Sequence, residues 1–520
     1  MGIPSYFSFI MKNYKNIIKK REAVKVIHHL CMDCNSIIYD SFYDIEAEYN
    51  KRAFDLSTIE PKIIQLVIEK IEQLIVEISP EKTAFITFDG VAPFAKMNQQ
   101  RKRRYKSSFM TRIPKMAQTI PSNDDKKIWN TTYITPGTQF MEMLSKKINA
   151  HFLSTDKLEN IHYKINISCS DEAGEGEHKL FQWIRDTPLQ EDTIAVYGLD
   201  SDLIMLSIFH KQFTDNIFVF REAPNFRNVL DDPNSIKEKE KEKLFMDIDK
   251  LSHCIFAEMG NTTQYNNIRV YDYIFICFLL GNDFLPHIIS LNIRTIGIQM
   301  ILDTYKNIIG KYQDRSLIHP ITKDIQWKYV SIFINELSKK EHQNILQEHK
   351  IRDKFESWVW PNTGSKKDQD KIIENLPVIY RSEEKYISPK DSGWESRYYQ
   401  SLFDIDYTNT EIYSICENYI EGLAWIFQYY TKGACNNQWS YKYHYAPLLE
   451  DLKKYIGKID LTEIYKEKPM CSKEEQLKYV IPPDILSELF PNDITIKKTP
   501  IEYKLRWAYC RYLWEAHPLL

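Results

Sequence analysis

Short apolar runs alternate with helical patterns over residues 1–310. Three of the apolar runs end in aspartate, at Asp33, Asp89 and Asp200, and each is predicted to form a buried strand. Between the first two, the segment 61–78 repeats apolar residues at helical spacing, which predicts a crossover helix. Strands that alternate with helices in this way predict an α/β fold, with a mostly parallel twisted sheet flanked by helices.

The pattern changes beyond residue 310 and divides the chain into three parts. Regular patterns weaken over 311–390, where the stretch TGSKKDQDK predicts a linker or variable segment. Residues 391–520 are rich in aromatic side chains, and we expect a second, mainly helical region there. Within the first part, the charged stretch 224–245 is expected to be a surface excursion, because it contains few core-forming residues.

Composition limits the classes of partner and compartment. The 520 residues carry a net charge of −3, so a contact with nucleic acid needs a local basic patch rather than an overall positive field. Nine irregularly spaced cysteines favour a reducing compartment, and the pair Cys31 and Cys34 lacks the second pair that a zinc site needs. No apolar stretch is long enough to span a membrane, and the first residues lack a signal-peptide pattern. We therefore expect a soluble intracellular protein.

Acidic residues occur where an open α/β sheet binds its ligands, beyond the carboxyl ends of the strands. Besides the strand-end aspartates, carboxylates stand at a predicted helix start near residue 177 and in a turn near residue 283. Acids that converge on one crevice cannot all stay ionised unless cations accompany them. Oxygen-only ligands favour Mg²⁺ or Mn²⁺, and two such ions would support phosphodiester hydrolysis. The candidate ligands are Asp33, Asp89, Glu175, Glu177, Asp200, Asp202 and Asp283.

A dense basic run, FAKMNQQRKRRYK, follows the second predicted strand. A solvated helix face is one interpretation, because runs of like charge are usually exposed. The position of the run directly after Asp89 leaves open why so many cations lie beside an acidic residue. Lys96, Gln100 and Arg104 are spaced by four residues and would share one helical face, whereas Arg101 and Lys102 would point elsewhere.

Several motifs resemble the signature blocks of the XRN-type 5′→3′ exoribonucleases. The first part contains MDCNSIIYD, FDGVAPFAKMNQQRKRRY, ITPGTQFM, GEGEHK, YGLDSDLIML and FLLGNDFLPH, and the third contains ESRYYQSLF, YIEGLAWIFQYYTKG and WSYKYHYAPLLEDL. The resemblance implies a catalytic core of the flap-nuclease or PIN-like kind over residues 1–310, which residues 391–520 brace. It also implies processive hydrolysis of 5′-monophosphorylated, decapped RNA to nucleoside 5′-monophosphates.

The resemblance also implies roles for particular residues. The seven acids would bind two Mg²⁺ or Mn²⁺ ions. Trp439 would stack on a base, and Tyr39 stands where the family usually has a stacking histidine. His178 and His444 are expected to be structural. The residues that would hold the 5′-phosphate are Lys96, Gln100, Arg103 and Arg104.

The sequence departs from the family's pattern in two places. The segment after the basic run is short, so Pro114 and Pro121 are expected to truncate any helix there. The long C-terminal domains of cytoplasmic members are missing, so the chain resembles a minimal catalytic form. Two alternatives stay open: a structure-specific flap endonuclease, whose family lacks the KMNQQR block, and a non-catalytic RNA-binding scaffold, which would be expected to have lost acidic ligands.

The expected partner is single-stranded RNA with a 5′-monophosphate, and a decapping enzyme is a further candidate partner. We expect no membrane contact and a monomeric protein. The expected location is the cytoplasm, with the nucleus as the alternative.

Overall fold

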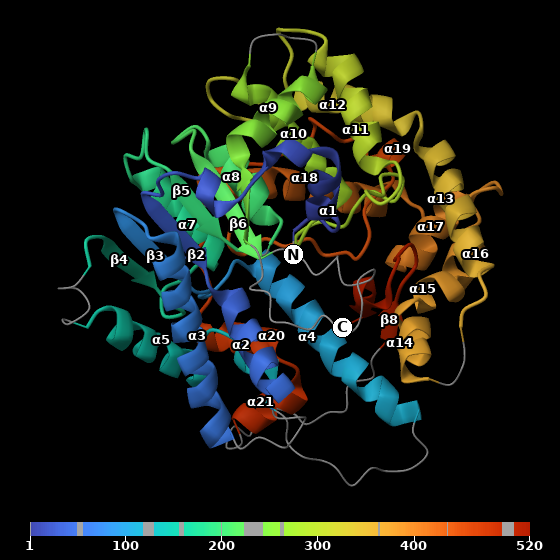
Figure 1. Cartoon of the computed structure of the whole chain (residues 1–520). Coiled ribbons are helices and arrows are strands. Elements are labelled where there is room, and N and C mark those ends of the chain that lie inside the picture. The colour runs from blue at the N-terminus through green and yellow to red at the C-terminus, as the bar shows by residue number, and fades with distance from the viewer. Residues whose placement is uncertain are drawn as a thin grey trace.

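A seven-stranded sheet forms the centre of the first part, in the strand order β1-β7-β6-β5-β2-β3-β4 (Figure 1). The structure is a computed structural model that describes residues 2–48, 56–117, 129–154, 161–198, 200–222, 243–260, 265–361, 365–433, 435–490 and 504–519. The five strands from β4 to β6 pair in parallel, whereas β7 pairs antiparallel with both β6 and β1. The predicted α/β fold with a mostly parallel sheet is therefore confirmed. The strands are β1 (Ile18–Lys19), β2 (His29–Asp33), β3 (Thr83–Thr87), β4 (Lys164–Ser168), β5 (Ile194–Tyr197), β6 (Ile217–Glu222) and β7 (Lys243–Asp247).

The central strands send alternate side chains into two separate apolar clusters, because successive residues of a strand point to opposite faces. In β2, Leu30 and Met32 enter one cluster and Cys31 enters the other. Burial on both faces explains why these strands appear in the sequence as continuous apolar runs. The first cluster includes α2 (Asn35–Glu48), α3 (Leu56–Ile78), which contains the predicted crossover helix, and α5 (Gln139–Phe152). The second includes α7 (Gly176–Asp186), α8 (Asp202–His210), α9 (Ile248–Met259) and α10 (Asn267–Cys277).

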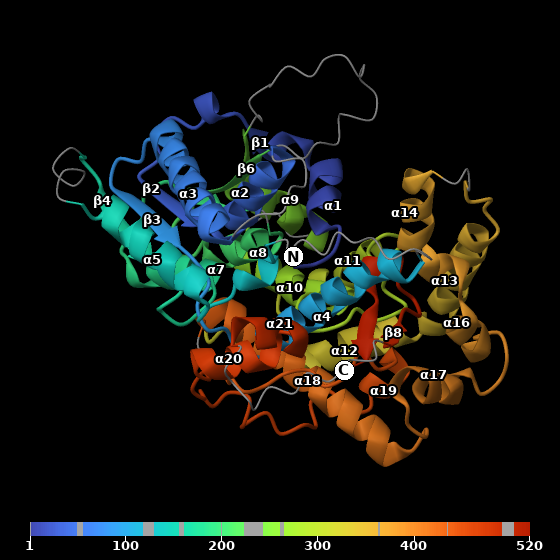
Figure 2. The same cartoon turned by 90° about the horizontal axis from the view of Figure 1, so that it is seen from below.

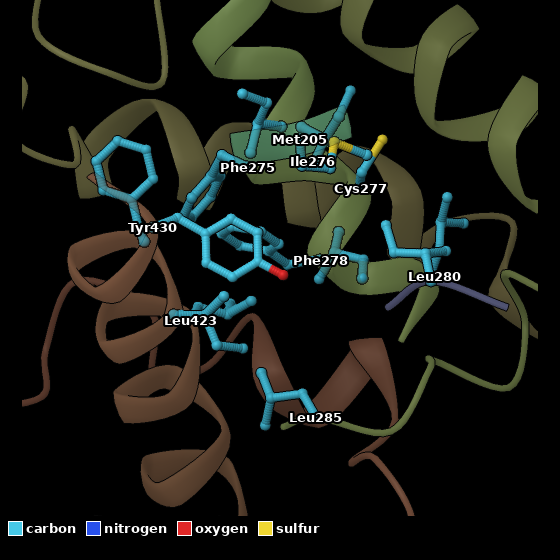
Figure 3. Packing of buried hydrophobic residues seen from close by; sticks show 14 of the residues in the cluster. Met205, Phe275, Ile276, Cys277, Phe278, Leu280, Leu285, Leu423 and Tyr430 are labelled. Atoms are coloured by element: carbon cyan, nitrogen blue, oxygen red, sulfur yellow. The ribbon is translucent and has the colours of Figure 1, made fainter. Parts of the chain in front are cut away.

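The second region is mainly helical, as predicted, and packs directly on the first. Its long helix α18 (Asn409–Lys432) contacts α8. Figure 3 shows Leu423 and Tyr430 of α18 packed near Phe275 and Phe278. The ring centroids of Phe278 and Tyr430 are 5.4 Å apart. One buried apolar cluster therefore joins the two regions.

The segment 311–390, expected to be a linker or variable segment, contains five helices, α12 to α16. Within the stretch TGSKKDQDK, residues 366–371 belong to α14, and Thr363 and Gly364 lie outside the described residues. The domain boundaries stay predictions. None of the described helices has the length and apolar composition needed to cross a membrane. The remaining elements are α1 (Tyr6–Asn13), α11 (Gly297–Tyr305), α12 (Trp327–Ser338), α13 (Glu341–Glu356), α14 (Lys366–Glu374), α15 (Leu376–Ile379), α16 (Ser382–Ile387), α17 (Trp394–Phe403), α19 (Leu449–Leu452), α20 (Lys473–Val480), α21 (Pro483–Leu489), β8 (Lys504–Arg506) and β9 (His517–Leu519).

The stretch 224–245, expected to be a surface excursion, ends in strand β7, so this part of the expectation is wrong. Phe245 of β7 is buried, and its ring stacks on Phe220 of β6 with the centroids 4.8 Å apart. Residues 223–242 lie outside the described residues. Strand β7 therefore lies inside the sheet, between β1 and β6, although the charged residues that precede it in the sequence do not predict a strand.

Helix α4 (Phe94–Ala117) carries the basic run and lies between the sheet and the second region. It includes Pro114, so the expected truncation at that residue is wrong, and Pro121 lies outside the described residues. The backbone N–H of Phe94 donates to the carbonyl of Asn437 at 2.8 Å, and Lys106 donates to the carbonyl of Ala516 at 3.0 Å. Helix α20 and strand β9 also contact α4, and Figure 2 shows α4 passing α20 and β8. The second region therefore supports α4 along much of its length.

Candidate active site

Three strand ends bring carboxylates to one edge of the sheet. Asp33 is the last residue of β2, Asp89 follows β3, and Asp200 follows β5. Because β2 lies between β3 and β5 and all three run parallel, their carboxyl ends meet. These aspartates line a cavity of about 350 Å³ together with Glu175 and Glu177.

The two glutamates reach the cavity because α7 begins beside the strand ends. Glu175 is the N-cap of α7, and Glu177 lies in its first turn, where the helix dipole favours a negative charge. The backbone N–H of Gly176 donates to Asp89 Oδ1 at 2.7 Å. A Cβ atom at Gly176 would lie only 2.7 Å from Asp33 Oδ1, so the close approach requires glycine. Strand ends and helix start thus form one acidic wall.

Lys96 ties the remaining acids to this wall. Its Nζ lies 2.6 Å from Glu175 Oε2 and 3.0 Å from Asp283 Oδ2, and all three side chains are buried. Burial alone would lower the pKa of Lys96, but the surrounding carboxylates raise it well above its usual value. Burial would likewise raise the pKa of Asp283, but the positive charges beside it, Lys96 among them, hold it below its usual value. This lysine and Asp283 are therefore both ionised in the folded protein.

One lysine does not neutralise the acidic cluster. Burial, and then the neighbouring carboxylates of Asp89 and Asp200, raise the pKa of Asp33 well above its usual value. Burial, together with the charge of Asp283, raises the pKa of Asp202 to about 7. Asp202 Oδ1 is also buried without a hydrogen-bond partner among the described residues. A divalent cation would satisfy both the charge and this oxygen, so the oxygen-rich set fits Mg²⁺ or Mn²⁺.

His178 and Tyr429 are two members of this site whose positions the sequence did not indicate. One ligand atom each of Glu175, Glu177 and His178 lie within 4.8 Å of one another. The His178 ring stacks on Tyr429 with the centroids 3.6 Å apart, and the Tyr429 hydroxyl donates to Glu175 Oε1 at 2.7 Å. Tyr429 belongs to α18, so the second region reaches the acidic cluster directly. Only its position in the aromatic-rich motif could have signalled this contact.

The basic helix lines the same cavity with the four side chains that the family resemblance selected. Burial lowers the pKa of Arg104 to about 10, and its Nη2 donates to the carbonyl of Ile134 at 3.3 Å. Gln100 Oε1 and Arg104 Nη1 are buried without partners among the described residues, so both can bind a ligand. The guanidinium of Arg101 packs instead over the rings of Tyr105 and Tyr479, at 5.0 and 4.7 Å, as its predicted direction requires. The four side chains in the cavity are Lys96, Gln100, Arg103 and Arg104.

The structure brings only one of the two predicted stacking residues to this cavity. Tyr39 of α2 lines it, and so does Tyr43, one helical turn further on and exposed. Trp439 is 7% exposed, stacks on Trp425 at 5.2 Å and donates its Nε1–H to Glu421. The ring of Trp439 therefore packs against α18 and is not among the residues that line this cavity, and its stacking on a base stays a prediction.

Gly2 is a further site residue that the sequence did not reveal. It has a φ of +53°, and a Cβ atom there would lie 2.2 Å from Asp202 Oδ1 and 2.6 Å from Ser201 Oγ. Backbone from the start of the chain therefore lies directly against the acid that begins α8. Asp202 and Asp283 are the last two of the seven predicted acids. The charge of Asp283 acts on Asp202, and Lys96 joins Asp283 to the acids that line the cavity.

Curated relatives of this chain are exoribonucleases from several organisms. It is 25% identical to the 5′-3′ exoribonuclease 2 homolog of Drosophila melanogaster, over 100% of this chain and 69% of the relative. It is 24% identical to 5′-3′ exoribonuclease 2 of Gallus gallus and 26% to 5′-3′ exoribonuclease 1 of Homo sapiens, over 87% and 96% of this chain. The chain spans 61% and 32% of the length of these two relatives.

A solved structure and two family models are also similar to this chain. The catalytic core of Rad2 in complex with DNA substrate is similar at a TM-score of 0.31 and 9% identity, over 95% of this chain and 100% of that chain. This TM-score is too low to bear on function. The model of the XRN 5′-3′ exonuclease N-terminus matches residues 1–223. The model of the Xrn1 helical domain matches residues 263–389 and 380–492. Together with the shared acidic and basic motifs, these matches show that the chain belongs to the XRN family of 5′-3′ exonucleases.

Proposed function

We propose that this protein is a metal-dependent 5′→3′ exoribonuclease that processively hydrolyses RNA with a 5′-monophosphate and releases nucleoside 5′-monophosphates. The observation that carries the proposal is the cavity in which an acidic cluster faces four phosphate-binding side chains. The relatives that are named 5′-3′ exoribonucleases support it. A purely RNA-binding scaffold would have no need for buried, mutually repelling acids, whose desolvation destabilises the fold.

The acidic cluster is the proposed metal site. Two Mg²⁺ or Mn²⁺ ions would supply an activated water and stabilise the charge that develops on the scissile phosphate. Lys96 holds Glu175 and Asp283 in fixed positions through its two ion pairs, so this part of the ligand set is preorganised. The proposed ligands are Asp33, Asp89, Glu175, Glu177, Asp200, Asp202 and Asp283.

The α4 side chains are proposed to select the RNA end. A terminal phosphate carries two negative charges, and Lys96, Arg103 and Arg104 can donate charge-assisted hydrogen bonds to it while Gln100 adds a neutral donor. Tyr39 and Tyr43 offer aromatic faces at the same cavity, and stacking on them would hold the leading bases without regard to sequence. The phosphate is thereby fixed on one side of the acids while the next phosphodiester bond lies against them.

The partners and the location of the protein are also part of the proposal. Single-stranded RNA that a decapping enzyme has left with a 5′-monophosphate fits the cavity's single row of phosphate-binding groups. The described cavity contains both the acids and the basic side chains that the proposed reaction needs. We further propose that the protein acts as a monomer in the cytoplasm.

Product analysis tests the reaction itself. With Mg²⁺ or Mn²⁺, RNA carrying a 5′-monophosphate and a uniform internal label is expected to yield labelled nucleoside 5′-monophosphates from the first time point, which thin-layer chromatography resolves. A flap-type endonuclease would release oligonucleotides instead. A scaffold would bind the RNA and release nothing, and either result would overturn the proposal.

Gly2 provides a test of how closely the acids must be held. Gly2→Ala is expected to lower the rate of hydrolysis about tenfold, because the new methyl group must displace Asp202 from its position. The rate at saturating RNA is the measurement. Gly393→Ala is the matched control: Gly393 also has a positive φ, of +75°, but it caps α17 outside the cavity. If both variants lose the same activity, backbone strain and not the contact with Asp202 is responsible.

A further inference from the structure

A second cavity, of about 460 Å³, lies along a neighbouring face of α4; we call it the back cavity. Its walls come from α4, from the turns after α10 and from the segments 441–445 and 508–518 of the second region. Gly2 and Asp283 reach it from the acidic cluster, and Arg103 lines both cavities. The acidic cluster therefore borders both cavities. A volume of this size is within the range of about 300–1,000 Å³ that small-molecule sites occupy.

The wall of the back cavity combines aromatic rings with cations. Tyr443 and Trp514 present rings to it, and Lys102 and Lys106 add charges beside Arg103. Among the described residues, no carboxylate forms an ion pair with Lys102 or Lys106, and burial lowers the pKa of each to about 8. Both lysines are half-buried, and the two carboxylates that also line the cavity, Asp283 and Glu515, pair instead with Lys96 and Arg294. The lysines therefore favour an anionic ligand, because its charge would offset the cost of their desolvation.

Polar atoms without partners also face this space. Both amide atoms of Gln99, Asn282 Nδ2, His444 Nδ1 and the Tyr445 hydroxyl are buried and make no hydrogen bond among the described residues. The whole of Tyr445 is only 4% exposed. Buried polar groups are normally paired, so a cluster of unpaired donors and acceptors in one cavity indicates a ligand that pairs them. The wall therefore offers aromatic rings that can stack on a base, cations that can bind a phosphate, and polar groups that can form hydrogen bonds with the edges of a base.

We infer that the back cavity binds the released nucleoside 5′-monophosphate, and so gives the product of the proposed reaction a site separate from the RNA. The inference rests on the proposed function. After each cut the RNA chain still fills the first cavity, so the mononucleotide must leave by another side. Arg103 can contact a phosphate from either cavity, which gives the product phosphate a continuous set of cationic partners as it moves from one face of α4 to the neighbouring face. The cavity is of the size of a small-molecule site, and its unpaired groups surround it on several sides.

The test uses adenosine 5′-monophosphate as the probe and the full chain saturated with 5′-monophosphorylated RNA in EDTA, so that the first cavity is filled and nothing is hydrolysed. Calorimetry is expected to show that AMP binds this RNA-loaded protein. Lys102→Ala is expected to weaken AMP binding about tenfold, as the loss of one charge-assisted hydrogen bond predicts. Trp514→Ala is expected to weaken it as well, and its ring is 44% exposed, so the fold should tolerate the change. Lys442→Ala is the matched control, because Lys442 is exposed on the same segment and does not line the cavity.

Three results would overturn the inference. AMP could fail to bind once RNA is present, which would mean that the two share one site or that RNA itself fills the back cavity. Inorganic phosphate could bind as tightly as AMP, which would mean that the cavity does not recognise a nucleoside. Lys102→Ala and Trp514→Ala could both bind AMP like the control. None of these results requires hydrolysis, so each leaves the proposed exoribonuclease activity standing, and that activity fails only in the product analysis described above.

Discussion

Asp200→Ala is expected to lower RNA hydrolysis at least about a thousandfold, because removing a metal ligand forfeits several kcal/mol of stabilisation at the scissile phosphate. Asp200 lines the cavity at the end of β5. Burial would raise its pKa, but neighbouring positive charges, Lys96 among them, hold it below its usual value, so Asp200 is ionised. RNA binding should largely remain, since the α4 side chains and not Asp200 hold the phosphate. Single-turnover rates with 5′-monophosphorylated RNA, and filter binding of the same RNA, measure the two effects separately.

The control for this variant is Asp171→Ala, which removes an exposed acid from the loop that leads into α7. It is expected to keep full activity. Addition of EDTA to the unmodified protein should reproduce the defect of Asp200→Ala, and added Mg²⁺ or Mn²⁺ should reverse it. Undiminished hydrolysis by the variant, or by the protein in EDTA, would contradict the metal mechanism.

Arg103→Ala is expected to reduce the preference for a 5′-monophosphate end about a hundredfold, the effect of losing strong charge-assisted hydrogen bonds to a dianion. The unmodified protein should degrade 5′-monophosphate RNA much faster than 5′-hydroxyl or 5′-triphosphate RNA. We expect this because a 5′-hydroxyl end lacks the charge that α4 is proposed to bind, and because a 5′-triphosphate is expected to be too large for the proposed phosphate site. Relative rates on three end-labelled RNAs that differ only at the 5′ end give the preference directly.

Arg101→Ala is the matched control on the same helix. Its guanidinium packs over Tyr105 and Tyr479 instead of lining the cavity, so its loss should leave the end preference unchanged. If Arg101→Ala and Arg103→Ala reduce the preference for a 5′-monophosphate end equally, the basic run acts only through its overall charge. Equal rates of the unmodified protein on all three ends would contradict the phosphate site and favour the endonuclease alternative.

The sequence predicts those parts of the site that depend on local chain geometry. The ends of parallel strands necessarily share one edge, so Asp33, Asp89 and Asp200 could be placed together before their positions were known. The turn of a helix likewise placed Gln100 and Arg104 on one face of α4 and Arg101 on another. In both cases the repeat of the secondary structure carries the information.

Contacts between distant segments leave no such periodic signal, so the sequence did not predict them. Tyr429 touches Glu175 across the interface of the two regions, and Gly2 meets Asp202 only because the start of the chain folds back over α8. The burial of Trp439 leaves no signal for the same reason, since it depends on how α18 presents Trp425. Charged neighbours also concealed β7, whose place at the sheet depends on pairing with β6 rather than on its own pattern.

The support of α4 by the second region has a consequence for the order of events during synthesis. The ribosome completes the sheet, the acids and the basic helix before residues 437–517 emerge, and early segments fold first. Yet Phe94 bonds to Asn437, Lys106 bonds to Ala516, and Tyr429 bonds to Glu175. A nascent chain therefore lacks the groups that support α4 until translation is nearly finished. If the proposed function holds, the messenger RNA still being read meets only an incompletely assembled active site.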